Sequence, residues 1–531
     1  MKKKFGKLNV FLLIFLGITV LYPLLMMIGH INVSDIGKLV GSVGFQEALK
    51  NSLFVGVIAT LISVIVAYLL AYSINRTNIK HRAVLKLCIT VPMLIPSISH
   101  GLGLINLFGA RGIISSLFGF NIVGSLGIIV GSVLYSFPIA FLIIDDGFKY
   151  VDTNLYESAR VLGLNFHQTF FKVTFTYLKK PLFSAVFAVF TMIFTDYGVP
   201  LSVGGMYTTL PVFLYKEVIG LLNYSTGTIV GLFLLIPAFI SFMVDTFMRD
   251  YASTSASGRE LVLKENKVRD VIFKIYTYVI ILSVFVIIGS FVYYAVMDNV
   301  LLNPVLSMKH FNYVISNDVG GYLFNSLVIS GGVAIFGTLI TYFVAYVTGR
   351  VRGKMARIIH ILTIITLAVP GMVLGLAYSI SFSGTFIYNT FLLLIIVNII
   401  HFIASPYLMA YNALQKVNMN YEIVAKTCNV GLLRIIKDVI IPCTKLTIRE
   451  MFAYFFVNSM ITISAVAFLY NTKNMPLSIL INTYEGNMML GEAAIISLII
   501  LMFNVIIKLV IYLINRREDR RKYNEVTYES F

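Results

Sequence analysis

Long apolar runs separated by short polar stretches are the dominant pattern along this chain. A helix needs about 20 mostly apolar residues to cross the hydrocarbon core of a membrane. Twelve windows meet that requirement: residues 9–29, 53–74, 84–107, 122–144, 181–204, 226–247, 271–296, 327–348, 358–382, 388–412, 451–470 and 492–514. They are too long and too uniformly apolar to be barrel strands. The pattern therefore predicts an all-α polytopic membrane protein with about twelve transmembrane helices.

The first window follows the basic residues Lys2, Lys3, Lys4 and Lys7, an arrangement also found in signal peptides. Its apolar stretch is long, however, and no small-residue cleavage site follows it. We therefore expect it to be a retained first span.

Basic residues fall almost entirely on one side of the predicted spans. If the N-terminus is cytoplasmic, all but six of the 41 Lys and Arg residues lie in inner segments, as the positive-inside rule requires. The six exceptions are Lys38, Lys50, Arg111, Lys216, Lys309 and Lys473. The sequence thus predicts a multi-pass protein of the cell (plasma or inner) membrane with both termini cytoplasmic.

The composition narrows the class of protein further. Hydrophobic residues make up 58% of the chain and charged residues 12%, against about 45–50% and about 25% in soluble proteins. This excludes a soluble enzyme, a nucleic-acid-binding protein and a disordered scaffold, and it assigns the net charge of +17 to loops that face anionic lipid. The three cysteines and seven histidines show no ligand or redox spacing, so we expect no metal site and no cofactor.

A tandem repeat organises the whole chain. Residues 51–76 align without gaps to residues 325–350, and the same spacing of 274 positions maps Pro96 onto Pro370. The recurring residues are Asn51, Ser52, Leu53, Tyr68, Ala71, Tyr72, Arg76 and Gly101. Each copy holds six spans in the same orientation, as in membrane proteins whose halves are related by an axis along the membrane normal.

The repeat gives a simple domain division. We expect a first transmembrane domain at 1–248 and a second at 271–515, joined by a polar cytoplasmic linker at 249–270. A basic cytoplasmic tail occupies 516–531. That tail is typical of a stop-transfer anchor, and binding to anionic lipid headgroups is the alternative.

Each half also carries a long polar insertion after its fourth span, at 145–180 and 413–450. Both read as a short amphipathic helix, a turn and a second helix, with Ala159 and Ala425 in matching places 266 residues apart. A single copy could be a solvated loop. Two copies at matching positions indicate docking elements for a two-fold cytosolic partner.

These insertions resemble the EAA loop of importer-type ABC transporter permeases, whose pattern runs E-A-A-x3-G-x9-I-x-L-P. The residues that the resemblance places in the coupling loops are Glu157, Ala159, Gly163, Glu422, Ala425, Asn429 and Pro442. The second copy departs from the pattern at two of them: Asn429 stands at the glycine position, and Glu422 lies one residue before the expected acid.

The resemblance covers nearly the whole chain and implies two tandem parallel six-helix permease domains of an ABC importer. It also implies a cytosolic ABC ATPase dimer docked on the two loops and an extracytoplasmic solute-binding protein that delivers the substrate. The chain contains no G-x-x-x-x-G-K-[ST] motif, so we expect no P-loop nucleotide site and no enzymatic activity of its own.

The same resemblance gives a substrate prediction. The stretches FTDYGVPLSVGG (194–205), 219–245 and 459–471 look most like the 2-aminoethylphosphonate branch of the family. That solute is the first prediction, iron(III) is the second, and thiamine or a polyamine follows.

Ionisable residues within spans are costly to bury and often mark a translocation path. Asp196, beside Tyr197 in the fifth span, either satisfies backbone groups at a helix break or lines that path. The corresponding stretch of the second half offers Ser459, Thr462 and Ser464, with Thr462 opposite Asp196. We predict an asymmetric path lined by these five residues.

Two other classes of membrane protein have to be weighed. An ion-coupled secondary carrier requires ligands for the coupling ion near the midplane, and Asp196 is almost the only buried acid that the spans offer. A membrane-embedded enzyme requires a nucleophile, a metal cluster or paired carboxylates, and the spans show none. The carrier would also leave the paired cytoplasmic insertions unexplained.

Overall fold

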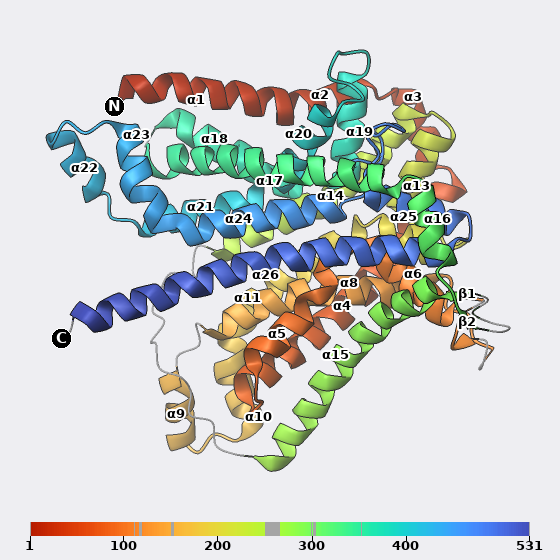
Figure 1. The fold of residues 1–531 in the computed structure, drawn as a ribbon, viewed down its shortest axis with the longest axis horizontal. Helices are drawn as coiled ribbons and strands as arrows, with labels where there is room; N and C mark the ends of the chain where they lie inside the picture. Colours follow the sequence, from red (N-terminus) through yellow and green to blue (C-terminus); the bar gives the residue numbers. More distant parts are fainter. Residues whose placement is uncertain are drawn as a thin grey trace. The chain divides into compact units, whose positions relative to one another are not determined.

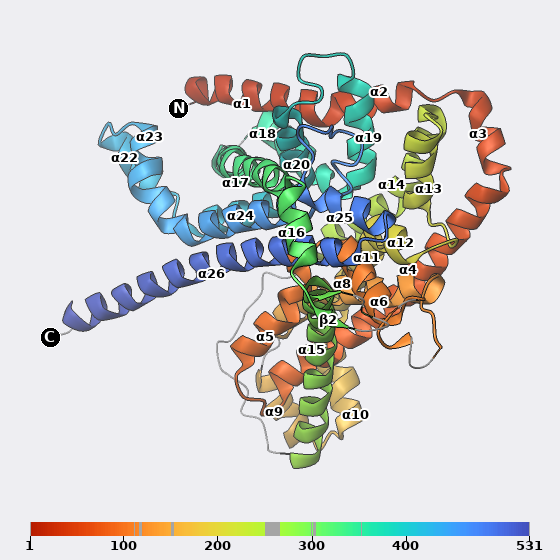
Figure 2. The same cartoon turned by 45° about the vertical axis from the view of Figure 1, so that its right-hand side comes forward.

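The computed structural model describes residues 2–110, 112–115, 119–149, 153–249, 266–298, 300, 304–351 and 353–529. These residues form helices almost throughout (Figures 1 and 2). The strands among them are β1 (Met297–Asp298) and β2 (Val305–Leu306), which pair antiparallel. The all-α fold class predicted from the apolar windows is confirmed.

The chain divides into two compact units. The first contains residues 1–32, 314–480 and 498–531, and the second contains 33–313 and 481–497. The helices of the first unit are α1 (Lys2–Leu16), η1 (Gly17–Leu21), α2 (Tyr22–Gly29), α17 (Val319–Arg350), α18 (Lys354–Ile365), η5 (Thr366–Ala368), α19 (Gly371–Phe382), α20 (Phe391–Phe402), α21 (Ala404–Lys416), α22 (Asn420–Thr427), α23 (Leu432–Ile435), η6 (Ile436–Ile440) and α24 (Ile441–Ile461).

The helices of the second unit are α3 (Val33–Val40), α4 (Val43–Arg76), α5 (Arg82–Thr90), η2 (Val91–Leu94), α6 (Ser97–Phe108), α8 (Ser125–Lys149), α9 (Thr153–Val161), α10 (Phe166–Thr169), η3 (Phe170–Thr174), α11 (Phe175–Phe194), α12 (Gly198–Val203), α13 (Leu210–Tyr215), η4 (Lys216–Gly220), α14 (Tyr224–Arg249) and α15 (Lys267–Val296). Three helices contribute residues to both units: α16 (Lys309–Ser316), α25 (Leu477–Gly486) and α26 (Leu490–Glu529).

Most elements recur in the same order in the two repeats. The long second span is α4 in one half and α17 in the other, and the stretch α9, α10, η3, α11 of the first half recurs as α22, α23, η6, α24. Polar contacts recur as well: the backbone N–H of Leu210 donates to Ser52 Oγ at 2.7 Å, and that of Leu477 donates to Ser326 Oγ at 2.6 Å. The repeat in the sequence is therefore a repeat in structure.

Among the described residues, eight helices are long and apolar enough to cross a membrane, and three bent pairs raise the number to eleven. Three of the expected spans, 84–107, 358–382 and 388–412, are helix pairs that bend by 95°, 112° and 57°. In the first two the break falls at the repeated prolines Pro96 and Pro370. Proline lacks a backbone N–H and holds the preceding residue in extended conformation, which ends the helix there.

The fifth span of each half also ends earlier than its apolar window predicts. Helix α11 stops at Phe194 and α24 at Ile461, whereas the windows continue to 204 and 470. Helix α24 holds the one remaining expected span, the window 451–470. It falls outside the eleven because its first half carries Lys445, Arg449 and Glu450.

The compact units differ from the domains expected from the sequence, because the first span of each repeat packs with helices of the other repeat. Helix α1 packs against α17 and α18, and Tyr378 Oη on α19 donates to the carbonyl of Thr19 at 2.6 Å. Helix α15 packs against α4 and α6, with Ser73 Oγ 2.7 Å from Thr277 Oγ1. Residues 250–265 of the expected linker lie outside the described residues.

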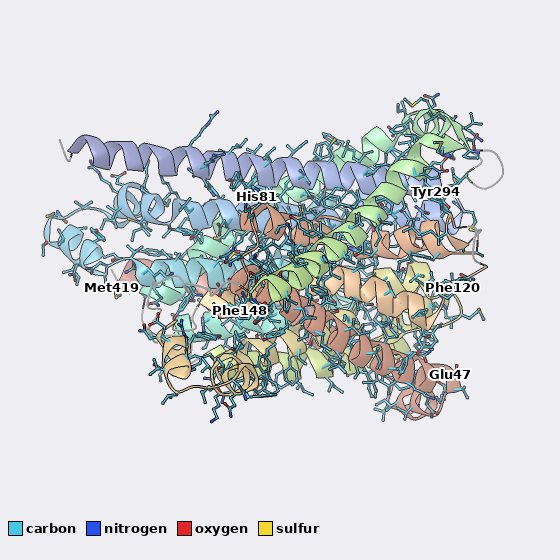
Figure 3. The ribbon with its side chains drawn as sticks, turned by 90° about the horizontal axis from the view of Figure 1, so that it is seen from below. Glu47, His81, Phe120, Phe148, Tyr294 and Met419 are labelled. Atoms are coloured by element: carbon cyan, nitrogen blue, oxygen red, sulfur yellow. The ribbon has the colours of Figure 1, made fainter. Side chains whose placement is uncertain are left out.

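Each unit has two distinct ends. In the second unit, His81 and Phe148 lie toward one end, and Glu47, Phe120 and Tyr294 toward the other (Figure 3). In the first unit, the start of α1, the pair α22–α23 and the end of α26 share one end (Figures 1 and 2). The start of α1 and the end of α26 thus lie at the same end of the first unit, as an even number of membrane crossings predicts.

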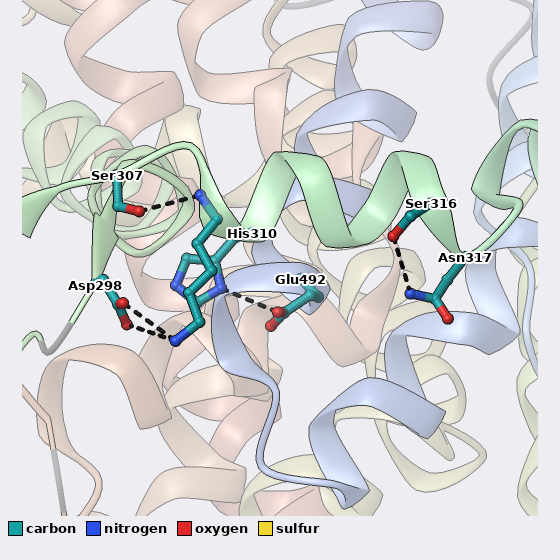
Figure 4. Close-up of polar contacts among 7 residues, drawn as sticks. Asp298, Ser307, His310, Ser316, Asn317 and Glu492 are labelled. Atoms are coloured by element: carbon teal, nitrogen blue, oxygen red, sulfur yellow. Dashed lines mark hydrogen bonds and ion pairs between the residues drawn. The ribbon is translucent and has the colours of Figure 1, made fainter.

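Helix α16 is held at its start by polar contacts within the second unit (Figure 4). His310 Nδ1 lies 3.0 Å from Glu492 Oε1 on α26, and Lys309 Nζ lies 3.2 Å from Asp298 on β1. These contacts fix the connection that follows α15.

Candidate functional site

The two polar insertions fold into matching helix-turn-helix elements. In the first half, α9 is followed by a turn, α10 and the π-helical turn η3, which runs directly into α11. In the second half, α22, α23 and η6 lead into α24 in the same way. We call α9–α10 and α22–α23 the coupling elements.

Both coupling elements end their first helix with the same backbone cap. The N–H of Leu164 donates to the carbonyl of Ala159 at 3.0 Å, and the N–H of Val430 donates to that of Ala425 at 2.8 Å. The residue directly before each donor has a left-handed backbone conformation, with φ of 67° at Gly163 and 55° at Asn429. Asparagine is among the few residues that tolerate this conformation, so the turn keeps its shape without the glycine.

The alanines of the motif face inward. Ala159 is 3% exposed and Ala425 is 7% exposed, so neither position has room for a longer side chain without displacement of a neighbour. Pro442 is the second residue of α24, directly after the π-helical turn η6. The residues at these positions of the motif therefore determine the shape of the element and how it packs inward.

The acids of the two elements occupy different environments. Glu157 is exposed on α9. Glu422 turns inward on α22, where its Oε1 lies 3.6 Å from Arg350 Nε and its side chain is 13% exposed. The position that matches Glu157 is held by Ile423, which is 59% exposed. The shift of the acid by one residue in the sequence is thus a change from an outward to an inward position.

The outward surfaces also differ in where their apolar residues lie. At the end of α9, Val161 and Leu162 are 88% and 75% exposed. On α22, the exposed hydrophobic residues are Tyr421, Ile423 and Val424, in the first half and middle of the helix. Each element thus has a small apolar patch formed by these exposed side chains.

Sequence reasoning missed the inward partners of these elements. Arg76 and Arg350 were noted only as matching positions of the repeat, yet each is the last residue of its long helix and lies against the coupling element of its half. Their signal was available, because a cation at the end of an apolar span recurs in both halves. Tyr156, which faces Arg76, gave no signal in the sequence.

The candidate path residue Asp196 lies in the break between α11 and α12. Its carboxylate accepts a hydrogen bond from the backbone N–H of Val199 at 2.9 Å. This contact caps the start of α12, which is the first of the two roles that the sequence left open. Tyr197 is fully buried, and its ring centroid lies 4.9 Å from that of Tyr215.

The candidate path residues of the second half lie at the matching break, in the first unit. The carbonyl of Thr462 accepts a hydrogen bond from Ser478 Oγ at 2.7 Å. Ser459 Oγ is buried without a hydrogen-bond partner among the described residues. Ser464 packs against Gly371, the first residue of α19. The two breaks are alike in position and unlike in polar content.

A buried acid that the sequence analysis did not single out lies in the second unit. Glu485 on α25, between the last two spans, accepts a hydrogen bond from Ser202 Oγ on α12. Burial raises the pKa of Glu485 to about 7, and the hydrogen bond from Ser202 works against that shift. Within the described part of the chain, no group of three or more His, Cys, Asp or Glu residues could hold a metal ion.

Comparison with known proteins identifies the architecture. The family model described as "Binding-protein-dependent transport system inner membrane component" matches residues 59–302 and 337–520. The ferric transport system permease protein FbpB of Actinobacillus pleuropneumoniae is 24% identical over 456 residues, which cover 81% of this chain and 66%, just under two thirds, of that relative.

Two further relatives show how widely the similarity extends. An Fe(3+)-transport system permease protein of Haemophilus influenzae is 22% identical over 93% of this chain and 95% of its own length. A spermidine/putrescine transport system permease homologue of Mycoplasma genitalium is 30% identical over 33% of this chain. All three are named as permeases of transport systems, two of them for ferric iron and one for spermidine and putrescine.

Proposed function

Because the chain belongs to the family of binding-protein-dependent transport system inner membrane components, as a permease of an ABC importer, we propose that an ATPase dimer drives it through α9–α10 and α22–α23. The family implies both an ATPase and a solute-binding protein as partners. In this proposal the chain is the transmembrane pathway and the partner hydrolyses ATP.

The matching backbone of the two coupling elements is the observation that carries this proposal. Both end in the same cap, both expose an apolar patch, and both run through a π-helical turn into the fifth span of their half. Two equivalent elements suit a partner with two equivalent grooves, and an amphipathic helix laid in a groove is a common recognition mode.

The proposed mechanism follows from that connection. Closure of the ATPase dimer around ATP displaces the coupling elements, and because η3 and η6 are continuous with α11 and α24, the fifth spans move with them. The breaks after Phe194 and Ile461 and the bends at Pro96 and Pro370 then change the opening of the path. The coupling elements and both termini are cytoplasmic in this proposal.

We assign the translocation path to the residues at the two breaks, with Asp196 and Tyr197 from one half and Ser459, Thr462 and Ser464 from the other. Asp196 also caps α12, so two variants separate the roles. Asp196→Asn keeps an oxygen for the cap and removes the charge, whereas Asp196→Ala removes both. Normal solute uptake by both variants would contradict the assignment.

For the solute, the observations favour a small ion. Relatives that align over most of this chain are named as ferric iron permeases, which supports iron(III). The resemblance of 194–205 to permeases for 2-aminoethylphosphonate supports the phosphonate. Uptake of ⁵⁵Fe(III) and of labelled 2-aminoethylphosphonate, each with the co-purified binding protein, distinguishes the two.

The first experiment is recovery of the chain from its own membranes in mild detergent, with bound proteins identified by mass spectrometry. We expect an ATPase with a Walker motif, and we expect it to be lost when Glu157, Gly163 and Ala425 are replaced together. The matched control is Glu47→Ala, an exposed acid at the opposite end of the second unit (Figure 3). Absence of any ATPase would favour an ion-coupled carrier instead.

A further inference from the structure

We infer that Arg76 and Arg350 are the positioning residues that fasten each coupling element to the transmembrane helices, by a cation–π contact in the first half and by an ion pair in the second. The inference rests on the proposed function, because it concerns how motion of the coupling elements reaches the spans. It assigns a role to residues that lie outside the EAA motif.

In the first half, the Arg76 guanidinium lies between two aromatic rings. Its Cζ is 4.7 Å from the ring centroid of Tyr156 on α9 and 5.2 Å from that of Phe148 at the end of α8. Arg76 is 8% exposed, so this contact is largely shielded from water, where cation–π attraction is strongest. Tyr156 Oη in turn lies 2.9 Å from Thr174 Oγ1 on η3, which connects α9 to the start of the fifth span.

In the second half, the matching arginine uses charge. The Arg350 side chain is 4% exposed, its Nη2 donates to the carbonyl of Val417 at 2.7 Å, and its Nε lies 3.6 Å from Glu422 Oε1. Both carboxylate oxygens of Glu422 are buried without a hydrogen-bond partner among the described residues. The positive charge of Arg350 therefore compensates a carboxylate that solvent reaches poorly.

The two contacts occupy equivalent places in the repeat. Arg76 and Arg350 are 274 residues apart, and their partners Tyr156 and Glu422 are 266 apart, as are Ala159 and Ala425 in the same helices. The contact is thus kept while its chemistry differs. A buried ion pair is a poor way to gain stability alone, because desolvation offsets the attraction, but removal of one partner leaves an uncompensated charge. Such a pair holds two elements in one register.

The position of each arginine determines what the contact can transmit. Arg76 ends α4, which packs along α8 and α11 in the second unit. Arg350 ends α17, which packs along α21 and α24 in the first. A coupling element fastened at that point transfers its displacement to the second span of its half as well as to the fifth span that follows it.

The test uses the full chain with its ATPase and binding protein in proteoliposomes, and measures solute uptake per ATP hydrolysed. We expect Arg76→Ala and Arg350→Ala to lower that ratio about fivefold or more, the lower end of typical coupling between sites. The control is Lys38→Ala, which removes an exposed ion pair with Asp35 and leaves the ratio unchanged. An equal fall of uptake and hydrolysis would overturn the inference.

Exchange variants decide the question even if the alanine variants do not fold. Tyr156→Glu gives the first half the ion pair of the second, and Glu422→Tyr gives the second half the aromatic contact of the first, so both keep the ratio. Tyr156→Lys and Glu422→Lys set like charges against the arginines and lose it. If Tyr156→Glu lowers the ratio as much as Tyr156→Lys does, the contact between Arg76 and residue 156 is not what couples α9 to the transmembrane helices.

A double variant with reversed charges gives a sharper test of the ion pair in the second half. Arg350→Glu together with Glu422→Arg restores opposite charges, and we expect it to recover most of the ratio lost in either single variant. Failure of the proposed function would look different, because the unaltered complex would then show no uptake dependent on ATP. Failure of this inference leaves that uptake intact and finds no difference between the exchange and like-charge variants.

Discussion

The two coupling elements share their backbone and differ in nearly every outward side chain. Both have the same left-handed cap and an inward alanine, yet one exposes Glu157 where the other exposes Ile423. The comparison separates two kinds of requirement. Shape and inward contact are constrained by the fold, whereas the outward surface is set by whatever each element meets.

The broken fifth spans teach the same lesson through an exchange of residues. In the first half, Gly198 on α12 packs against Ser97 on α6. In the second half, the places are reversed, since Ser464 packs against Gly371 on α19. Close approach of these segments requires one small residue at each crossing, and either side can supply it.

The largest effect is expected from filling these crossings. A Cβ at Gly198 would overlap Ser97 Oγ and lie 2.7 Å from the backbone nitrogen of Ile98. A Cβ at Gly371 would overlap Ser464 Oγ and approach His401 Nε2 at 3.0 Å. We expect each alanine variant to lose about 1–3 kcal/mol of stability in thermal unfolding in detergent, with Gly198→Ala the worse because backbone gives way less easily than side chains.

Paired replacements sharpen that comparison. Gly371→Ser with Ser464→Gly is expected to recover most of the loss, because the overlapping hydroxyl is removed. Gly198→Ser with Ser97→Gly is expected to recover less, since the Ile98 backbone remains in the way. Equal recovery in the two halves would show that the crossings are equivalent after all.

A smaller effect is expected at the left-handed caps. Gly163→Ala forces a Cβ into a conformation that costs L-residues roughly 1–2 kcal/mol, whereas Asn429→Ala loses less because asparagine already bears part of that cost. Asn429→Gly is therefore expected to be neutral or slightly stabilising in the same unfolding measurement. If Asn429→Gly weakens recovery of the ATPase instead, the asparagine side chain contacts the partner.

A dependence of stability on pH is expected from Glu485 on α25, in the second half. The raised pKa of Glu485 means that folding favours its neutral form. The contribution of neutral Glu485 to the stability of the fold is present below pH 4.5, its ordinary pKa, and is lost as the pH rises toward about 7. Glu485→Gln is expected to flatten the melting temperature across that range. An unchanged pH profile would show that Glu485 is well solvated.

Much of the fold could be predicted because membrane crossing leaves a strong signal in the sequence. The repeat, the sites of the spans and the helix-turn-helix insertions all follow from apolar runs and matching residues. The bends could not be placed from hydropathy, since the apolar runs continue through Pro96 and Pro370. The prolines themselves indicate where the two helices bend, and their recurrence in both halves distinguishes them from other prolines.

The candidate site was harder to predict in its inward contacts. A motif records which residue types recur along the chain, and it does not say which face of a short helix they occupy. The motif alone therefore marks Glu422 as a docking acid displaced by one residue, whereas the fold turns it toward Arg350. Contacts between residues about 70 or 80 positions apart depend on packing that local pattern does not encode.

The exchange of first spans has a consequence for how the protein is made. Helices α1 and α2 leave the ribosome well before α17 to α19, on which they pack, because those helices begin at residue 319. At about 5–20 residues per second, this interval corresponds to roughly 15–60 s of synthesis. Helix α1 must therefore wait in the lipid for a partner that does not yet exist, and neither unit can close before residues from 481 onward are made.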